Sequence, residues 1–322
     1  MKTSIALATF NGAAYLQAQL DSFAAQTQLP DELVVGDDCS TDATPSIIEA
    51  FAVAAPFAVR YHRNEANIGY SANFSGLLAR TTGDLVFLCD QDDVWFPEKI
   101  AHMCAFAGIE RSALAYLHDA ELTRADLKRA GITVQGQMRA LGRGDAHFAI
   151  GCCTAVRREL LDFSLPVPPL NTHDSWLISI AAALHAKAIT PRVLQYYRRH
   201  SETASADLIN HTKKITAVDI WKRGLFEILK PEQRARIDSG VESVQSYLDR
   251  LSDIVVTAPI RYRALLQHHI SDRRALLRLL RRRKELRNSN LLTRAPGVAA
   301  LLLAGEYRRM SGIKSAFRDL AG

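Results

Sequence analysis

Short apolar runs alternate with segments of helical hydrophobic spacing over the first 110 residues of this chain. The runs have the length of buried strands, and apolar residues between them recur at three- and four-residue intervals. Strands that alternate with helices in this way are typical of a doubly wound, mostly parallel sheet. We therefore predict an α/β fold with strands at 4–9, 33–36, 57–61 and 85–89, each followed by a helix.

The hydrophobic pattern becomes less regular after residue 110 and changes character near residue 205. Beyond residue 205 the strand patterns stop, and Leu, Ala and Arg recur at helical spacing. We therefore predict a domain of residues 1–205, followed by a basic helical region of residues 206–322. Within the second half of the first domain we predict a loop at 166–169, a helix at 177–184, and strands at 114–117, 147–155 and 193–197.

Three carboxylates, those of Asp90, Asp92 and Asp93, directly follow the predicted strand 85–89. Open α/β sheets bind their ligands at the carboxyl ends of strands. Carboxylates this close together repel one another unless a cation is present, and their oxygens suit Mg²⁺ or Mn²⁺. We predict a divalent-metal site that holds a phosphate-bearing ligand, with a solvated turn as the alternative. If the strand conformation continues, Asp90 and Asp92 share one face and Asp93 points elsewhere.

Polar residues near other predicted strands and helices can complete this site. Asp38 follows the strand at 33–36, where its carboxylate can accept hydrogen bonds from a base or a ribose. Asp174 lies in a predicted loop before a helix, where it can act as general base on an acceptor hydroxyl. His200 follows the strand at 193–197 and can join a metal shell as a neutral imidazole. A purely structural role is the alternative for Asp174 and for His200.

Composition places the chain among ordinary globular proteins, with 48% hydrophobic and 23% charged residues. No apolar run approaches the roughly 18 residues that are needed to span a bilayer. The first residues lack the basic-then-apolar pattern of a signal peptide. The five cysteines form no Cys-x-x-Cys pair, which indicates reduced thiols rather than a disulfide framework or a zinc site. We therefore expect a cytoplasmic protein.

Basic residues gather at the end of the chain, although the net charge is only +6. Residues 257–322 contain 15 Arg or Lys against 4 Asp or Glu, a local balance of +11. Between 273 and 284, arginines alternate with leucines in the pattern of a basic amphipathic helix, which can lie on an anionic membrane surface. The alternative is packing on the first domain or on a second subunit of a homo-oligomer. No nucleic-acid partner is expected, because the site chemistry gives no reason for one.

Several short motifs follow one another in a fixed order between residues 3 and 200. They are Leu7–Gly12, Asp37–Asp42, Asn67–Gly69, Phe87–Trp95, His173–Trp176 and Tyr197–His200. Their order and spacing resemble the family-2 inverting glycosyltransferases with the GT-A fold, and most of all the bacterial rhamnosyltransferases. The resemblance divides the first domain into a nucleotide-sugar half, about 1–110, and an acceptor half, about 111–205.

The resemblance also implies roles for individual residues. Asp174 would be the catalytic base, Asp38 would contact the base of the nucleotide, and Asp92 with His200 would hold the metal. The acceptor side would include Gly151, His173 and Trp176. The nucleotide-sugar pocket would be lined by Thr9, Asn11, Asp38, Asn67, Gly69, Asp90, Gln91 and Asp92.

The activity implied by the resemblance is a metal-assisted single displacement that inverts the anomeric carbon. The enzyme, a hexosyltransferase, would move rhamnose from dTDP-rhamnose, or a sugar from a UDP-sugar, to a hydroxyl group. The acceptor would be a glycan or lipid-linked precursor of a surface polysaccharide or lipopolysaccharide. We expect peripheral attachment to the inner face of the cell membrane, where such precursors are built.

Two other classes of protein remain as alternatives. Asp90 and Asp92 after an apolar strand also resemble the nucleophile motif of haloacid-dehalogenase-like phosphatases, in which the first Asp attacks phosphorus. Here, however, three strand–helix units precede the motif and no Asp-Asp pair follows it. The third class is a non-catalytic nucleotide- or glycan-binding module. Against it stands the combination of acids and histidine at Asp38, Asp92, Asp174 and His200.

Overall fold

The computed structural model describes residues 1–200, 211–216, 219, 233–309 and 312–321. The chain divides into two compact units. The first unit contains Met1–Val167 and Asn171–Ile215, and the second contains Pro168–Leu170 and Thr216–Gly322. The predicted boundary near residue 205 lies outside the described residues and stays a prediction.

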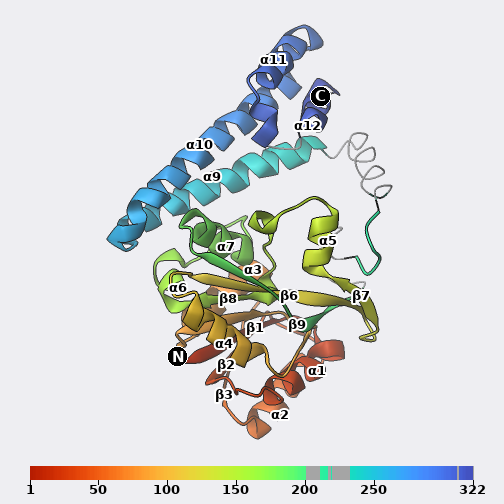
Figure 1. Ribbon diagram of the computed structural model, residues 1–322, viewed down its shortest axis with the longest axis vertical. Coiled ribbons are helices and arrows are strands. Elements are labelled where there is room, and N and C mark those ends of the chain that lie inside the picture. Colours follow the sequence, from red (N-terminus) through yellow and green to blue (C-terminus); the bar gives the residue numbers. More distant parts are fainter. Residues whose placement is uncertain (201–210, 217–218, 220–232, 310–311, 322) are drawn as a thin grey trace. The chain divides into compact units, whose positions relative to one another are not determined.

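In the described residues of the first unit, nine strands form a single mixed sheet (Figure 1). The strands are β1 (Thr3–Thr9), β2 (Glu32–Asp37), β3 (Ala58–Arg63), β4 (Leu85–Cys89), β5 (Val94–Trp95), β6 (Ala115–Arg124), β7 (Arg129–Thr133), β8 (Thr154–Arg157) and β9 (Lys187–Arg199). Their order is β3-β2-β1-β4-β8-β6-β9-β5, and β7 pairs with β6. The pairs among β1 to β4 are parallel, whereas β8 is antiparallel to both of its neighbours. The predicted α/β fold with a mostly parallel sheet is confirmed.

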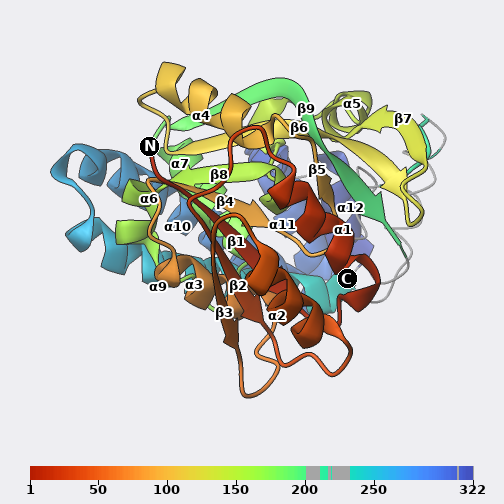
Figure 2. The ribbon, with the colours of Figure 1, turned by 90° about the horizontal axis from the view of Figure 1, so that it is seen from below.

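Helices cover both faces of this sheet. On one face lie α1 (Ala13–Ala24), α2 (Thr44–Ala54) and α4 (Lys99–Ile109), and on the other α3 (Tyr70–Arg80), α6 (Arg158–Ser164) and α7 (His173–Ala183), as Figures 1 and 2 show. The short α5 (Val134–Ala140) packs on β6 and β7. All five residues of β4 are inaccessible to solvent, because a strand covered on both faces has no polar side. The core between strands and the first set of helices includes Ile5, Leu7, Val35, Phe87, Leu20, Phe23, Ile48 and Met103.

The carboxyl ends of the central strands meet at one edge of the sheet. Thr9 of β1 is in register with Asp37 of β2, and Leu7 of β1 with Cys89 of β4. The loops that follow these three strands therefore start side by side. These loops carry five of the predicted nucleotide-sugar residues, Asn11, Asp38, Asp90, Gln91 and Asp92, whereas Thr9 ends β1 and Asn67 and Gly69 follow β3.

The predicted strand at 147–155 is wrong for most of its length. The chain there forms two 3₁₀ turns, η1 (Asp145–His147) and η2 (Gly151–Cys153), and β8 begins only at Thr154. The physical reason is local bonding: the Cys153 N–H and the Thr154 hydroxyl both donate to the Ile150 carbonyl, at 3.2 and 2.7 Å. These bonds replace the inter-strand bonds that a strand would need.

The helix predicted at 177–184 begins earlier, at His173. Thr172 caps it, because its side chain accepts the N–H of Ser175 at 3.3 Å. Asp174 therefore lies in the first turn of α7, and its prediction as a loop residue is wrong. The carboxylate is consequently fixed on a rigid element.

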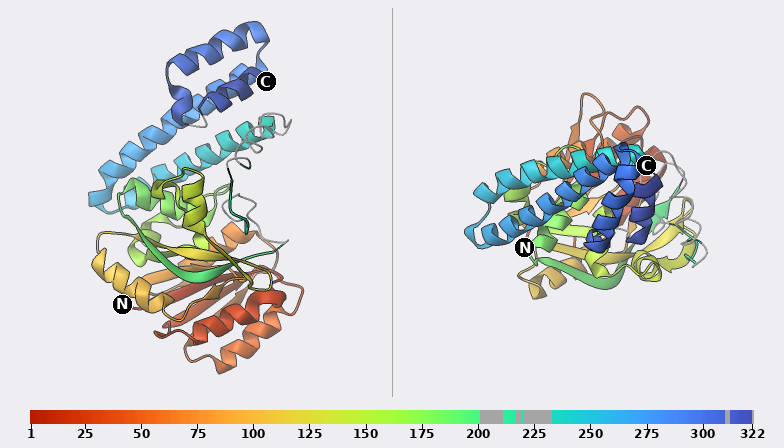
Figure 3. Two further views of the ribbon diagram at one scale, coloured as in Figure 1. Left: turned by 45° about the vertical axis from the view of Figure 1, so that its right-hand side comes forward. Right: turned by 90° about the horizontal axis from the view of Figure 1, so that it is seen from above.

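The described residues of the second unit confirm the predicted helical C-terminal region. They form α9 (Gln233–Thr257), α10 (Ile260–Asn288), α11 (Leu291–Leu303), η4 (Glu306–Arg309) and α12 (Ile313–Ala321). Figure 3 shows α9 and α10 running side by side from a short connection. None of the described helices is long and apolar enough to cross a membrane.

One part of the predicted basic amphipathic face is buried instead. Arg283 and Arg287 both bind the carboxylate of Asp319 at 2.6 Å, and the Tyr307 hydroxyl donates to the same group at 2.7 Å. Asp319 is inaccessible to solvent, so these bonds tie α12 to α10 in the interior of the unit. Arg283 belongs to the predicted basic face, but it is buried and its positive charge pairs with the carboxylate of Asp319.

Candidate active site

The loops after β1 and β4 are joined by the side chain of Gln91. Its amide accepts the Phe10 N–H at 2.8 Å and donates to the Phe10 carbonyl at 2.9 Å. Gly12 leaves the space for this contact, since a Cβ there would lie 2.1 Å from Oε1 of Gln91. Asn11 has a φ of 46° and accepts the N–H of Thr41 at 2.8 Å, which joins the β2 loop as well. Two predicted pocket residues thus hold three loops together.

Asp37, at the end of β2, has a structural role. It is inaccessible to solvent and accepts hydrogen bonds from the hydroxyls of Thr9, Ser40 and Tyr61. The guanidinium of Arg63 lies 3.4 Å from the same carboxylate. Thr9, which is predicted to line the pocket, is only 2% exposed, and its hydroxyl donates to Asp37.

Asp38 organises the loop that precedes α3. One carboxylate oxygen accepts the Asn64 side-chain amide and the Ile68 N–H, both at 2.9 Å, and the other accepts the Gly69 N–H at 2.8 Å. Gly69 has a φ of 85°, which a side chain would disfavour. Asn67 accepts the same Gly69 N–H at 3.1 Å. The structure therefore brings together Asp38, Asn67 and Gly69, three residues predicted to lie near the nucleotide.

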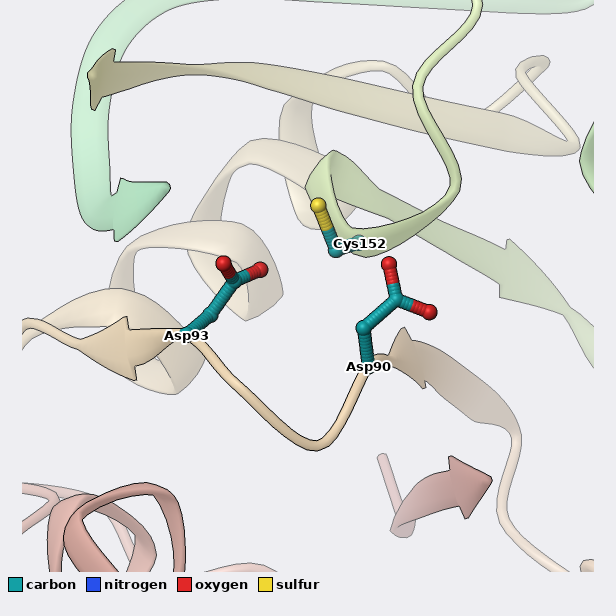
Figure 4. A group of neighbouring side chains, drawn as sticks. All are labelled: Asp90, Asp93 and Cys152. Atoms are coloured by element: carbon teal, nitrogen blue, oxygen red, sulfur yellow. The ribbon is translucent and has the colours of Figure 1, made fainter. Parts of the chain in front are cut away.

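The acid cluster occupies a turn between β4 and β5. Since β4 ends at Cys89, the strand conformation required for Asp90 and Asp92 to share a face does not continue. Figure 4 shows Asp90 and Asp93 on the two sides of the turn, both directed toward Cys152 of η2. The potential ligand atoms of these three residues all lie within 4.8 Å of one another. Asp92 is not a member of this group.

Asp92 contacts His200 instead. Its Oδ2 lies 2.8 Å from Nε2 of the imidazole, so the structure brings the two predicted metal ligands together. Tyr15 lies beside the histidine, with ring centroids 4.4 Å apart. Arg198 donates to the carbonyl of Asp92 at 2.7 Å and holds the turn from the β9 side.

The electrostatics of the turn favour a bound cation. Burial raises the pKa of Asp90 to about 7, and the negative charges of Asp92 and Asp174 add to the effect. Burial and the charges of Asp92 and Asp90 also raise the pKa of Asp93 well above its usual range. A divalent cation would relieve this repulsion, and the carboxylate oxygens suit Mg²⁺ or Mn²⁺. The residues present therefore fit a metal of this kind.

The thiol of Cys152 does not share that suitability. The pKa of this thiol is well above its usual range, mainly because of its hydrogen bond with Cys153 and secondly because of burial. A protonated thiol is a poor ligand, and hard cations prefer oxygen donors.

Asp93 is anchored by a buried network that the sequence analysis missed. Gln195 donates to it at 2.8 Å, and the Arg198 N–H donates at 3.1 Å. Behind Gln195 lies Lys99, only 1% exposed, whose ammonium donates to Gln195 at 2.6 Å and to the Cys152 carbonyl at 3.1 Å. No local motif signals this network, because its hydrogen-bonded partners are 53 to 105 residues apart in the sequence.

The acceptor side of the site is built around Gly151. A Cβ at this glycine would lie 3.5 Å from Oδ2 of Asp174 and 3.3 Å from Nε2 of His173. Oδ1 of Asp174 accepts the N–H of Ser175 at 2.7 Å, which fixes the carboxylate. Among the described residues, no donor is bound to Oδ2. This oxygen is therefore available to a hydroxyl group of a ligand.

The donor-side acids and Asp174 are close enough to interact. The charge of Asp174 contributes to the raised pKa of Asp90. Both carboxylates also act on Tyr70. Its pKa is raised mainly by burial, and the negative charges of Asp174 and Asp90 raise it further. The two halves of the predicted site thus meet between Asp90 and Asp174.

His173 and Trp176, both predicted on the acceptor side, lie largely in the interior. His173 is 5% exposed and stacks on Phe74 with ring centroids 3.7 Å apart. Neither of its ring nitrogens has a partner among the described residues. Trp176 is inaccessible, and its indole N–H donates to the Ser164 carbonyl at 2.9 Å, so it packs behind the site.

His173 is expected to make the protein less stable in acid. Burial lowers the pKa of His173 to about 4. Between about pH 6.5 and pH 4 this histidine is therefore protonated in the unfolded chain and neutral in the folded chain. Stability attributable to this group is therefore lost as the pH falls from about 6.5 toward 4. Between pH 7 and pH 5 the loss is about 2 kcal/mol.

The variant His173→Phe keeps a ring against Phe74 and cannot take up a proton. Urea unfolding at pH 7 and pH 5 should show a smaller acid-induced loss in this variant than in the wild type. His268→Gln, which changes an exposed histidine of α10, should keep the wild-type difference. Identical pH dependence in His173→Phe and the wild type would contradict the assignment.

Comparison with known proteins places these observations in a family. Residues 4–164, half of the chain, match the model of Glycosyl transferase family 2. The chain belongs to glycosyl transferase family 2. Family membership confirms the resemblance and the GT-A fold, and it decides for a glycosyltransferase over the phosphatase and the non-catalytic binding module.

Individual proteins and one solved structure are also similar to this chain. An uncharacterized protein of Mycobacterium tuberculosis is 26% identical over 345 residues, which cover 98% of this chain and 95% of that protein. The dTDP-rhamnosyl transferase RfbG of Shigella flexneri is 31% identical over 98 residues, 29% of this chain and 34% of that protein. Among solved structures, residues 1–349 of Staphylococcus aureus TarS, in complex with UDP, have a TM-score of 0.56 at 21% identity. That match covers 85% of this chain and 88% of the TarS chain and supports the fold.

Proposed function

We propose that this glycosyltransferase moves a sugar from a nucleotide-diphospho-sugar to a hydroxyl group of a surface polysaccharide precursor, with inversion at the anomeric carbon. The observation that carries the proposal is the position of Asp174. Its Oδ2 is open next to Gly151, and its charge acts on Asp90 of the donor side. A base on one side and a diphosphate site on the other is the arrangement that a single displacement needs.

The donor nucleotide is proposed to bind over the loops after β1 and β2. Asp38 already fixes the loop of Asn67 and Gly69, and we propose that it also accepts a hydrogen bond from the nucleotide base. Thr9, Asn11 and Gln91 are proposed to shape the same pocket. Hydrogen bonds of Thr9, Asn11 and Gln91 join the strand ends and loops, which limits the ordering that donor binding has to supply.

Asp92 and His200, with Asp90, are proposed to hold Mg²⁺ or Mn²⁺. When bound, such a cation supplies positive charge for the diphosphate group. The carboxylate of Asp92 and the imidazole of His200 are already in contact and partly exposed, with 16% and 9% of their side chains accessible. Asp93, in contrast, is inaccessible and engaged by Gln195 and Arg198, so we propose that it supports the turn.

Asp174 is proposed to take the proton from the acceptor hydroxyl. The oxygen of that hydroxyl then bonds to the anomeric carbon as the bond from this carbon to the diphosphate breaks. The diphosphate leaves with the electron pair. Helix α7 holds the carboxylate in place through the Ser175 N–H, while Gly151 keeps space for the acceptor.

Rhamnose from dTDP-rhamnose is the proposed donor sugar, with a UDP-sugar as the alternative. The similarity to dTDP-rhamnosyl transferase RfbG over 98 residues supports it. The proposed acceptor is a lipid-linked or glycan precursor of a surface polysaccharide such as lipopolysaccharide. We further propose that exposed arginines of α10 and the exposed Leu291 and Leu292 of α11 attach the enzyme to an anionic membrane surface.

A donor screen tests the proposed function. The full chain is incubated with dTDP-rhamnose, UDP-sugars and GDP-sugars, with Mn²⁺ or Mg²⁺ and an extract of lipid-linked glycans, and the released nucleoside diphosphate is measured. We expect acceptor-dependent release with dTDP-rhamnose, which is abolished by EDTA. If UDP is released from UDP-sugars and no dTDP is released from dTDP-rhamnose, the donor is a UDP-sugar. If no donor releases its nucleoside diphosphate, the proposed function is wrong.

A further inference from the structure

A second polar site lies in the second unit, between α9 and α10. A pocket of about 270 Å³, open to solvent on one side, lies between these two helices. Three arginines of α10 and three polar residues of α9 line it, and two buried leucines, one from each helix, form its floor. The polar lining consists of Arg274, Arg278, Arg281, Gln245, Asp249 and Ser252.

The arginines of this pocket have no acidic partner among the described residues. Arg274 and Arg278 have no hydrogen bond or ion pair within the described part of the chain. Arg281 donates to the side chain of Gln245 at 2.8 Å, a neutral partner. The four basic residues that follow Arg281 have acidic partners instead: Arg282 binds Glu285, Lys284 binds Asp238, and Arg283 and Arg287 bind Asp319.

The pocket therefore carries uncompensated positive charge. The lining contains three guanidinium groups and one carboxylate, that of Asp249. This carboxylate accepts a hydrogen bond from Gln245 at 2.7 Å. No ion pair joins Asp249 to any of the three arginines in the described residues. Arginines spaced three and four residues apart on one helix face repel one another. A bound anion would remove that repulsion.

The chemistry of the lining fits a phosphate group. The planar guanidinium fork donates two parallel hydrogen bonds to phosphate oxygens, and three arginines line this pocket. The hydroxyl of Ser252 already donates to the Leu248 carbonyl at 2.8 Å, so the donors for a ligand are the guanidinium groups. The leucine floor can contact an apolar part of a ligand. We propose that this pocket binds a phosphate or diphosphate group, carried either by a soluble molecule or by a lipid headgroup. The proposal does not rest on the sugar-transfer reaction, because all of its residues belong to the second unit.

Two binding measurements on the full chain test the pocket. The first is calorimetric titration with inorganic pyrophosphate in EDTA, which removes metal-dependent binding at the acid cluster. The second is co-sedimentation with phosphatidylcholine vesicles, with and without phosphatidylglycerol, at low salt. Each uses the wild type, the pocket variant Arg274→Gln/Arg278→Gln, and the control variant Arg282→Gln/Lys284→Gln. The control removes the same charge from exposed positions on α10 outside the pocket.

We expect the pocket variant to bind at least one probe about tenfold more weakly than the control variant does. Loss in the pyrophosphate titration alone would identify a soluble phosphate ligand, and loss with the anionic vesicles alone would identify a lipid headgroup. Absence of wild-type binding to both probes would overturn the proposal. Binding that is weakened equally in the pocket variant and the control variant would also overturn the proposal. Vesicle binding of that kind would reflect the general positive charge of α10 and not the pocket.

Discussion

Replacing Asp174 with Asn is expected to lower kcat by about a thousandfold, within the range that general acid–base catalysis supplies. The amide keeps the size of the side chain and can still accept the Ser175 N–H. It cannot take a proton from the acceptor hydroxyl. The first turn of α7 and the space at Gly151 should therefore remain while the chemical step fails.

Binding of the donor nucleotide separates this effect from a loss of structure. Titration with the nucleoside diphosphate of the active donor should give the same Kd for Asp174→Asn and the wild type. A matched control is Asp162→Asn, which removes an exposed carboxylate of α6 and should retain full turnover. Wild-type turnover in Asp174→Asn would exclude this residue as the base.

Asp92→Asn is expected to weaken activation by Mn²⁺ and to lower kcat/KM by at least about a hundredfold. The carboxylate contacts His200 at 2.8 Å and is partly exposed, so a cation and a diphosphate can both reach it. His200→Gln should show a smaller loss in the same direction, because a neutral amide replaces only one of the donors.

Cys152→Ser distinguishes between the two groups that can hold the metal. Cys152 belongs to the cluster with Asp90 and Asp93, whereas Asp92 and His200 form the other group. Measured as the Mn²⁺ concentration for half-maximal turnover, Cys152→Ser should resemble the wild type. If this variant loses Mn²⁺ activation and Asp92→Asn retains it, the metal belongs to the Asp90–Asp93–Cys152 cluster.

The parallel half of the sheet could be predicted from the sequence because its strands are buried on both faces. Strands β1, β2 and β4 are short apolar runs bounded by turn residues, so their positions follow from hydrophobicity alone. The segment 147–155 has the same apolar character but forms 3₁₀ turns. Its local bonds to the Ile150 carbonyl decide the structure, and hydrophobicity carries no information about them.

The sequence predicts those site residues that directly follow a single strand. It does not predict contacts between segments that are far apart in the chain. The acids at Asp90 to Asp93 stand out in the sequence, and the spacing of the motifs points to His200. The support of Asp93 by Gln195, and of Gln195 by Lys99, depends on tertiary packing between α4 and β9. In the second unit, likewise, nothing in the basic pattern distinguishes Arg283, which pairs with Asp319, from the unpaired Arg278.

The stereochemistry of the product tests the central claim most directly. The purified product of the active donor and acceptor is examined by NMR, and the configuration of the new glycosidic bond is read from the one-bond C–H coupling at the anomeric carbon. A single displacement assisted by Asp174 predicts a configuration opposite to that of the donor. Retention of the donor configuration would contradict the account.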